Sequence, residues 1–310
     1  MSAAPPASPR RAGLGRVFRS PTDGRLRAGW RLAVHAVLAI LLLIAFALPL
    51  SLILAGLAVA QLDVDLNAIA TGAGVVASVP AITLATWIAR RGLDRRSFFS
   101  LGLVFDRNTL LDLLVGFFIP AVLLGLVFLT EWSLGWLEFQ AWAWENGSCG
   151  GAVLGLVSGL ALFIAVGYQE ELLSRGYQLQ NLVDGLNLPL GLFLSSAAFS
   201  VLHLLNPHAS PASVLGILGA GYFLGYGWVR TRQLWLSIGL HIGWNFFEGT
   251  IFGFPVSGLH MFRLIEHTVG GPRLVTGGSF GPEAGLVILP ALALGAALVH
   301  LYTRGRPVQR

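Results

Sequence analysis

Residues 153–175 read VLGLVSGLALFIAVGYQEELLSR, an apolar run that contains two adjacent glutamates, Glu170 and Glu171. A helix of about 20 apolar residues is long enough to cross a bilayer. An ionisable side chain at the centre of such a helix costs about 2.5–3.5 kcal/mol even on insertion scales. Acids are therefore retained in membrane helices mainly where they are paired and used, and these two glutamates mark the segment as a candidate functional site.

The composition of the rest of the chain agrees with a membrane protein. Hydrophobic residues make up 55% of the sequence and charged residues 11%, and the mean hydropathy is +0.73. The net charge of +5 comes from arginine alone, since the chain has no lysine. Because the arginines cluster between apolar runs, we expect them to set topology and to contact anionic lipid headgroups. We therefore expect the lipid bilayer as a partner and no nucleic acid.

The apolar runs predict an all-α fold, a polytopic bundle of about eight transmembrane helices. Arginine-rich segments alternate with segments that carry acids or no charge, and under the positive-inside rule this pattern places both termini in the cytoplasm. We expect a multi-pass protein of the plasma membrane. The predicted spans are residues 32–57, 69–88, 110–129, 153–179, 188–205, 214–229, 234–252 and 285–302.

Four regions follow from these spans. Residues 1–28 are rich in proline, alanine and arginine and predict a disordered basic cytoplasmic tail. Residues 29–94 hold the first two transmembrane helices, residues 95–305 form the core that contains the polar motifs, and residues 306–310 form a second cytoplasmic tail. Cys149 is the only cysteine, which excludes a disulfide within the chain.

The two glutamates predict different roles. Glu171 and Arg175 are four residues apart, so their side chains face each other on a helix and can form an ion pair. Glu170 lies about 100° around the helix and has no such partner in its segment. Burial without a countercharge favours proton uptake by a carboxylate, which suits a general base. The alternative is a Glu–Glu–Arg cluster that merely reaches the cytoplasmic interface.

Two later apolar runs carry histidines. His203 is the one ionisable residue of its run, and such a histidine can simply be a hydrogen-bonded core residue. His241 and Asn245 lie four residues apart, so one helix face carries both. Together they can donate two hydrogen bonds to one oxyanion, although the same pair could hold a metal or bridge helices. Three costly polar motifs in three spans favour one shared buried site.

This pattern resembles the CPBP family of intramembrane endopeptidases, also called the CAAX-protease and bacteriocin-processing or Abi family. The resemblance covers about residues 95–305 and rests on three motifs in order: Glu170-Glu171-x-x-x-Arg175, Phe199-x-x-x-His203 and His241-x-x-x-Asn245. It implies an eight-helix enzyme of the type II prenyl-endopeptidase kind. In that resemblance Glu170 and His203 would activate a water, and His241 and Asn245 would stabilise the oxyanion. Glu171, Arg175 and Phe199 would support the site.

The leading hypothesis is hydrolysis of a peptide bond in a membrane-embedded or membrane-associated peptide or protein. The alternatives are a non-catalytic scaffold or immunity protein of the same fold and a proton-coupled transporter. Whether a metal takes part stays open, since Glu170, His203 and His241 could supply a zinc site, although no His-Glu-x-x-His motif is present. The arginine-rich composition is typical of GC-rich bacteria, where prenylated substrates are not expected.

The predicted spans contain one conflict. They place Glu171 near the cytoplasmic end of the fourth span and His203 near the outer end of the fifth. The two can meet if the fourth helix continues to about Asn181, or if the fifth begins late or kinks near Pro189 and Gly191.

Overall fold

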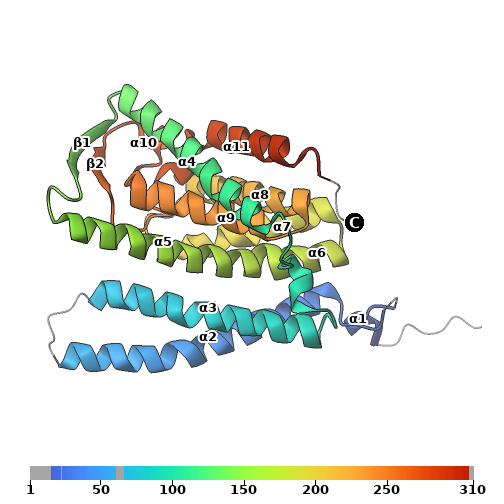
Figure 1. Ribbon diagram of the computed structural model, residues 1–310. Helices are drawn as coiled ribbons and strands as arrows, with labels where there is room; N and C mark the ends of the chain where they lie inside the picture. Colours follow the sequence, from blue (N-terminus) through green and yellow to red (C-terminus); the bar gives the residue numbers. More distant parts are fainter. Residues whose placement is uncertain (1–14, 22, 61–65, 307–310) are drawn as a thin grey trace, which may run out of the picture.

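The computed structural model describes residues 15–21, 23–60 and 66–306, and in this part of the chain long helices dominate. Most of them run side by side along one direction (Figure 1). The two strands lie at one end of the bundle, while the short helix α1 and the C-terminal end of α11 lie at the other. The α-helices are α1 Gly15–Phe18, α2 Ala28–Val59, α3 Leu66–Gly92, α4 Thr109–Ser133, α5 Cys149–Glu171, α6 Leu179–Gly185, α7 Leu188–Leu202, α8 Pro211–Thr231, α9 Trp235–Asn245, α10 Arg273–Thr276 and α11 Ile288–Thr303.

Shorter elements complete the fold. Two π-helical segments extend α-helices: η2 Leu172–Gln178 joins α5 to α6, and η4 Phe246–Ile251 extends α9. The 3₁₀ turns are η1 Phe98–Leu101, η3 His203–Leu205, η5 Gly278–Phe280 and η6 Pro282–Ala284. In the described chain the strands are β1 Leu137–Trp142 and β2 Ile265–Val269, which pair antiparallel with an irregularity between Phe139 and Ala141.

The protein is a polytopic helical membrane protein. Among the described residues, six helical segments are long and apolar enough to cross a membrane. They are Ala28–Val59, Gly72–Gly92, Thr109–Ser133, Cys149–Gly185, Leu188–Leu205 and Pro211–Thr231. Helix α11 is a shorter apolar helix, and α9 with η4 is interrupted by its π-helical turn. Six of the eight predicted spans overlap these six segments, and the other two overlap α9 with η4 and α11.

Two expectations from the sequence need correction or completion. The all-α expectation missed the β1–β2 pair, because its strands are short and lie more than a hundred residues apart, so that no hairpin signal joins them. Of the tail predicted over residues 1–28, residues 1–14 and 22 lie outside the described residues. The described part contains α1 and a bridge between Arg19 and Leu26, so it has more structure than its composition suggests. Of the second predicted tail, residues 307–310 also lie outside the described residues.

The conflict between the fourth and fifth spans is resolved by helix length. Helix α5 continues through η2 into α6, so that a helical segment of 37 residues, Cys149–Gly185, contains the two glutamates in its interior. Helix α7 starts at Leu188, with Pro189 in its first turn and the Asn187 side chain as its cap. Of the two explanations from the sequence, extension of the fourth helix past Asn181 is therefore correct.

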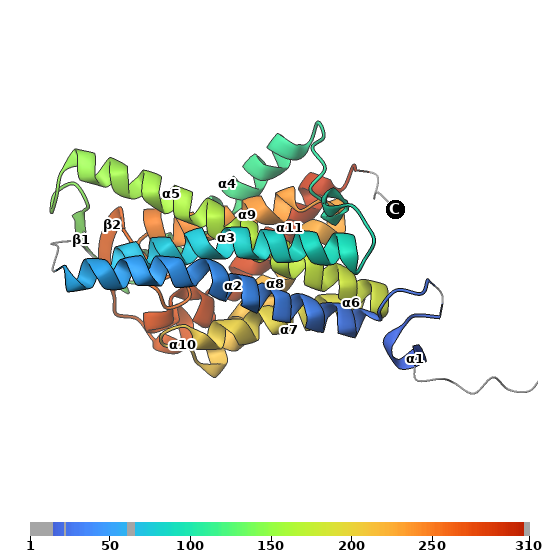
Figure 2. The ribbon, with the colours of Figure 1, turned by 90° about the horizontal axis from the view of Figure 1, so that it is seen from below.

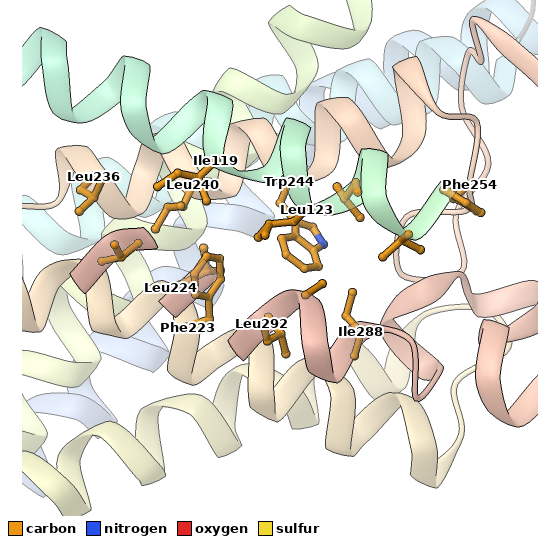
Figure 3. Packing of buried hydrophobic residues seen from close by; sticks show 14 of the residues in the cluster. Ile119, Leu123, Phe223, Leu224, Leu236, Leu240, Trp244, Phe254, Ile288 and Leu292 are labelled. Atoms are coloured by element: carbon orange, nitrogen blue, oxygen red, sulfur yellow. The ribbon is translucent and has the colours of Figure 1, made fainter. Parts of the chain in front are cut away.

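Close helix contacts form the centre of the bundle. Helices α4 and α9 touch along glycines: a Cβ at Gly239 would lie 2.5 Å from the Leu113 carbonyl oxygen, and one at Gly243 would lie 2.1 Å from that of Phe117. Small residues at such positions let helices approach closely in lipid. A hydrophobic cluster drawn from α4, α8, α9 and α11 packs beside this contact (Figure 3).

The α2–α3 hairpin lies along one side of this bundle (Figure 2). Helix α2 is largely exposed, as expected of a helix that faces lipid. The hairpin is fastened near one end by the buried Asp94, which pairs with Arg31 at 2.8 Å and with Arg90 at 2.9 Å. Further along, α3 contributes to the wall of the central pocket.

Candidate active site

A pocket of about 410 Å³ lies between α3, α5, α7, α8 and α9 and is closed on one side by the loop that follows η4. Most of its wall is apolar. Five of the predicted site residues line it together: Glu170, Phe199, His203, His241 and Asn245. The remaining two, Glu171 and Arg175, are fully buried beside it. The structure thus brings the three sequence motifs to one place.

Two of the motifs stand directly before a π-helical segment. Glu170 and Glu171 end α5 just before η2, and Asn245 ends α9 just before η4. A π-turn changes the direction in which the following side chains point and is often found at functional sites. Glu170, Glu171 and Asn245 are therefore held at the end of an α-helix, whereas Arg175 lies within the π-helical segment η2.

Glu171 is the centre of a buried polar cluster. Its Oε1 accepts a hydrogen bond from Arg175 Nη1 at 2.7 Å and lies 2.8 Å from His241 Nδ1. Arg175 also donates to the carbonyl oxygen of Gly221 on α8, at 3.0 Å. The ion pair expected from the four-residue spacing is present. Its connection to His241, seventy residues further along the chain, could not be read from spacing.

His241 lies between two carboxylates. With Nδ1–H donated to Glu171, its Nε2 faces the pocket and stands 3.7 Å from Oε2 of Glu170. The hydrogen bond at Nδ1 fixes the tautomer and the orientation of the ring. Glu170 itself keeps 31% of its side chain exposed, in contrast to Glu171 at 0%. The first glutamate is thus accessible from the pocket, and the second orients the imidazole.

His203 enters the pocket at the end of α7. Its Nδ1 donates to the Phe199 carbonyl oxygen at 2.8 Å, so Nε2 is left with a lone pair. A neutral imidazole held in this way can accept a proton or a hydrogen bond from a bound water. His203 therefore has a ring nitrogen available to a molecule bound in the pocket that it lines.

The Phe199 ring contacts an arginine and both histidines of the site. The Arg175 guanidinium stands over it at 4.4 Å, and the His203 ring lies 4.6 Å away. The His241 ring meets it edge-on at 6.0 Å. A cation over an aromatic face is stabilised by the ring quadrupole. Phe199 thus contacts both histidine rings and supports the arginine.

Asn245 lies one helical turn beyond His241 and lines the same pocket, with 7% of its surface exposed. Both side chains are therefore presented by α9 to one space that Glu170 also borders. A carbonyl oxygen bound in that space could accept a hydrogen bond from Asn245 and, when Nε2 of His241 also carries a proton, a second one from that ring. Two such donors are what an oxyanion intermediate requires.

A zinc site at Glu170, His203 and His241 stays an alternative prediction from the sequence. In the described part of the chain, no three side chains of histidine, cysteine, aspartate or glutamate converge in a way that could hold a metal ion. The Nδ1 atoms of His203 and His241 are both engaged by protein acceptors, so that the Nε2 atom of each ring stays available to a ligand. Glu170, His203 and His241 thus share a pocket without forming a coordination cage.

Sequence reasoning missed two buried acids near the pocket. Glu283 of η6 lines it, and burial raises the pKa of this carboxyl above its ordinary value. Glu248 of η4 is fully buried, and neither carboxylate oxygen has a hydrogen-bond partner among the described residues. Glu248 could have been found by the argument that singled out Glu170, since it is also an acid in an apolar helix. Glu283 follows a long loop, and no local pattern points to it.

One family model matches part of the chain. Residues 152–247 match the family described as type II CAAX prenyl endopeptidase Rce1-like. The match runs from α5 into η4 and includes all seven predicted site residues, whereas Glu248 and Glu283 lie beyond it. The search of curated proteins and the search of solved structures both found no match.

Proposed function

We propose, on the premise that the chain carries a domain of the Rce1-like type II CAAX prenyl endopeptidase family, that it is an intramembrane endopeptidase. Its substrates are peptides or proteins held in or at the membrane. The observation that carries the proposal is the convergence of Glu170, His203, His241 and Asn245 on one pocket within the helical bundle.

In this proposal a water binds between Glu170 and His203. Glu170, the more exposed of the paired glutamates, takes a proton from that water, and Nε2 of His203 accepts a hydrogen bond that orients it. The water oxygen then attacks the carbonyl carbon of the scissile peptide bond. A general base of this kind contributes typically 10²–10⁴-fold to the rate.

The tetrahedral intermediate carries its negative charge on the former carbonyl oxygen. Asn245 donates to that oxygen through its amide group, and His241 donates from Nε2 when it holds a second proton. Glu171 stabilises this imidazolium through Nδ1, and Glu170, 3.7 Å from Nε2, is in place to return a proton to the departing amine. Donors aimed at the developing oxyanion are typically the largest single contribution to such catalysis.

We further propose that eight helices cross the plasma membrane, with α9–η4 and α11 as the seventh and eighth spans. Both termini would then lie in the cytoplasm. The common position of α1 and the C-terminal end of α11 at one end of the bundle supports an even number of spans (Figure 1). In this organisation residues 29–94 form the α2–α3 hairpin, and residues 95–305 form the protease core.

The test is cleavage of a quenched fluorescent peptide library by purified protein in detergent, with and without a chelator. We expect cleavage by the wild-type protein that is lost in Glu170→Gln and is unaffected by the chelator. Glu266→Gln, which changes an acid of β2 that hydrogen-bonds Asn146, is the matched control and should cleave normally. A folded Glu170→Gln variant that cleaves like the wild type would contradict the proposal.

A further inference from the structure

The loop between η4 and α11 is folded into the wall of the pocket. Val256, Ser257 and Leu259 line the cavity, and Glu283 joins them from η6. The fit is tight: the Gly258 amide donates to the Phe280 carbonyl oxygen at 2.8 Å, and a Cβ at Gly258 would lie 2.0 Å from the carbonyl oxygen of Pro207. The loop is therefore a fixed part of the site.

A single carboxylate connects this loop to the helix that carries His241 and Asn245. Oε2 of Glu283 accepts hydrogen bonds from the Ser257 amide at 2.8 Å and from the Ser257 hydroxyl at 2.6 Å. Its Oε1 accepts from the Trp244 indole at 3.2 Å. Glu283 is only 4% exposed, so these bonds form away from bulk water. Trp244 directly precedes Asn245 in α9.

The same network reaches the segment that follows His203. Asn206 donates through Nδ2 to the carbonyl oxygen of Ser257 at 3.1 Å. Ser257 thus stands between Asn206 on one side and Glu283 on the other. The backbone of Glu283 is fixed as well, since a Cβ at Gly216 of α8 would lie 1.6 Å from its carbonyl oxygen. The network therefore connects the elements that carry His203 and Asn245 through one acid.

The Trp244 side chain is held both by packing and by its hydrogen bond to Glu283. Its ring lies in the hydrophobic cluster with Leu123, Phe223 and Ile288 (Figure 3). Its indole nitrogen donates to Glu283. A rotation of the indole would disturb both the packing and the hydrogen bond. The position of the α9 backbone at Asn245 is thus tied to the loop between η4 and α11.

We propose that Glu283 is a positioning residue for hydrolysis, which holds Asn245 and the segment after His203 in register through Trp244 and Ser257. This inference rests on the proposed function. A displacement of a catalytic group by about 1 Å can reduce a rate by about 10²-fold. Glu283 does not touch the reacting atoms in this account, so its loss lowers kcat and leaves KM nearly unchanged.

The experiment compares Glu283→Gln, Trp244→Phe and the double variant with the control Glu266→Gln in one peptide-cleavage assay. Glutamine places an amide donor against either the indole or Ser257, both of which are donors. We expect Glu283→Gln to lower kcat about 10- to 100-fold, with KM changed by less than about threefold. Trp244→Phe removes the same bond from its other end, so the double variant should be no slower than the worse single variant.

Hydrogen exchange on the same proteins separates this proposal from the proposed function. We expect Glu283→Gln to raise amide exchange both in residues 255–259 and in residues 241–247, and Glu266→Gln to change neither. Exchange that rises only in the loop, or additive losses of kcat in the double variant, would overturn the proposal. If the wild-type protein cleaves nothing, the proposed function fails, and the exchange result alone still decides whether Glu283 couples the loop to α9.

Discussion

Two pairs of buried or half-buried acids flank the pocket, and they are stabilised in different ways. The inner pair, Glu170 and Glu171, has Arg175 and His241 as neighbours of opposite or variable charge. The outer pair, Glu248 and Glu283, forms no ion pair within the described chain. Glu283 instead accepts three hydrogen bonds from neutral donors, and Glu248 accepts none.

The difference separates chemistry from positioning. A carboxylate beside a cation stays charged and can hold an imidazole ready to carry a proton. Two acids buried together without a cation cannot both be ionised at low cost. The inner pair therefore suits proton transfer, while the outer pair suits a fixed connection between the loop and α9.

The largest effect is expected from Glu171→Gln. The substitution leaves the Arg175 guanidinium buried without its countercharge and gives His241 Nδ1 a neutral amide oxygen in place of a carboxylate. Breaking a buried ion pair in this way typically costs about 3–5 kcal/mol. We expect a strong fall in thermal stability together with loss of cleavage. We would measure the unfolding temperature in detergent and the cleavage rate for both Glu171→Gln and the wild-type protein. An unchanged unfolding temperature would show that the inner pair is not held by this charge balance.

Phe199→Leu should have an intermediate effect. Leucine keeps an apolar side chain but removes the ring face under Arg175 and the contacts with both histidines, and a buried cation–π contact is worth about 2 kcal/mol. We expect a loss of stability of that order and a cleavage rate lowered by roughly tenfold. Phe199→Tyr, which keeps the ring, is the control. Equal behaviour of the leucine variant and the wild type would remove Phe199 from the supporting cluster.

Glu248→Gln should be nearly neutral and so contrasts with Glu171→Gln. It removes a buried carboxyl group that has no hydrogen-bond donor, while the size of the side chain is kept. We expect stability to change by less than about 1 kcal/mol, in either direction. Chemical or thermal unfolding of both variants side by side provides the measurement. If Glu248→Gln destabilises the protein as strongly as Glu171→Gln does, the Glu248 carboxyl group has a stabilising partner, which would contradict this expectation.

The smallest effect is expected from pH, through a histidine of the β1–β2 pair. Burial lowers the pKa of His267, whose Nε2 donates to the Phe252 carbonyl oxygen. The unfolded chain therefore binds a proton at a higher pH than the folded protein does, and stability falls as the pH drops below about 6.5. Unfolding temperatures between pH 7.5 and 5.5 measure this slope. His267→Gln should make the dependence of the unfolding temperature on pH shallower. An unchanged slope would show that other groups cause this dependence.

The sequence predicted what depends on local spacing. The apolar runs located the eight helical segments, and the Glu171–Arg175 spacing predicted an ion pair that the structure contains. The joint position of His241 and Asn245 on one helix face follows from the same geometry. The roles assigned to these residues in catalysis stay predictions.

What the sequence could not provide depends on contacts between distant segments. The bond between Glu171 and His241 joins two helices, and the bonds of Glu283 join a turn to a loop and a helix. The pairing of β1 with β2 is equally distant. No spacing rule reaches across such separations, because the partners meet only after the helices have packed. Glu248 is the exception, since an acid in an apolar helix is visible in the sequence itself.

The central claim is that the carboxylate of Glu170 activates water in this pocket. The most direct measurement is the single-turnover cleavage rate of the wild type, Glu170→Asp and Glu170→Gln, each reconstituted in the same lipid and checked for an unchanged unfolding temperature. We predict that Glu170→Gln lowers the rate by about 10²–10⁴-fold and that Glu170→Asp retains part of it. A Glu170→Gln rate within a few-fold of the wild type would contradict the account.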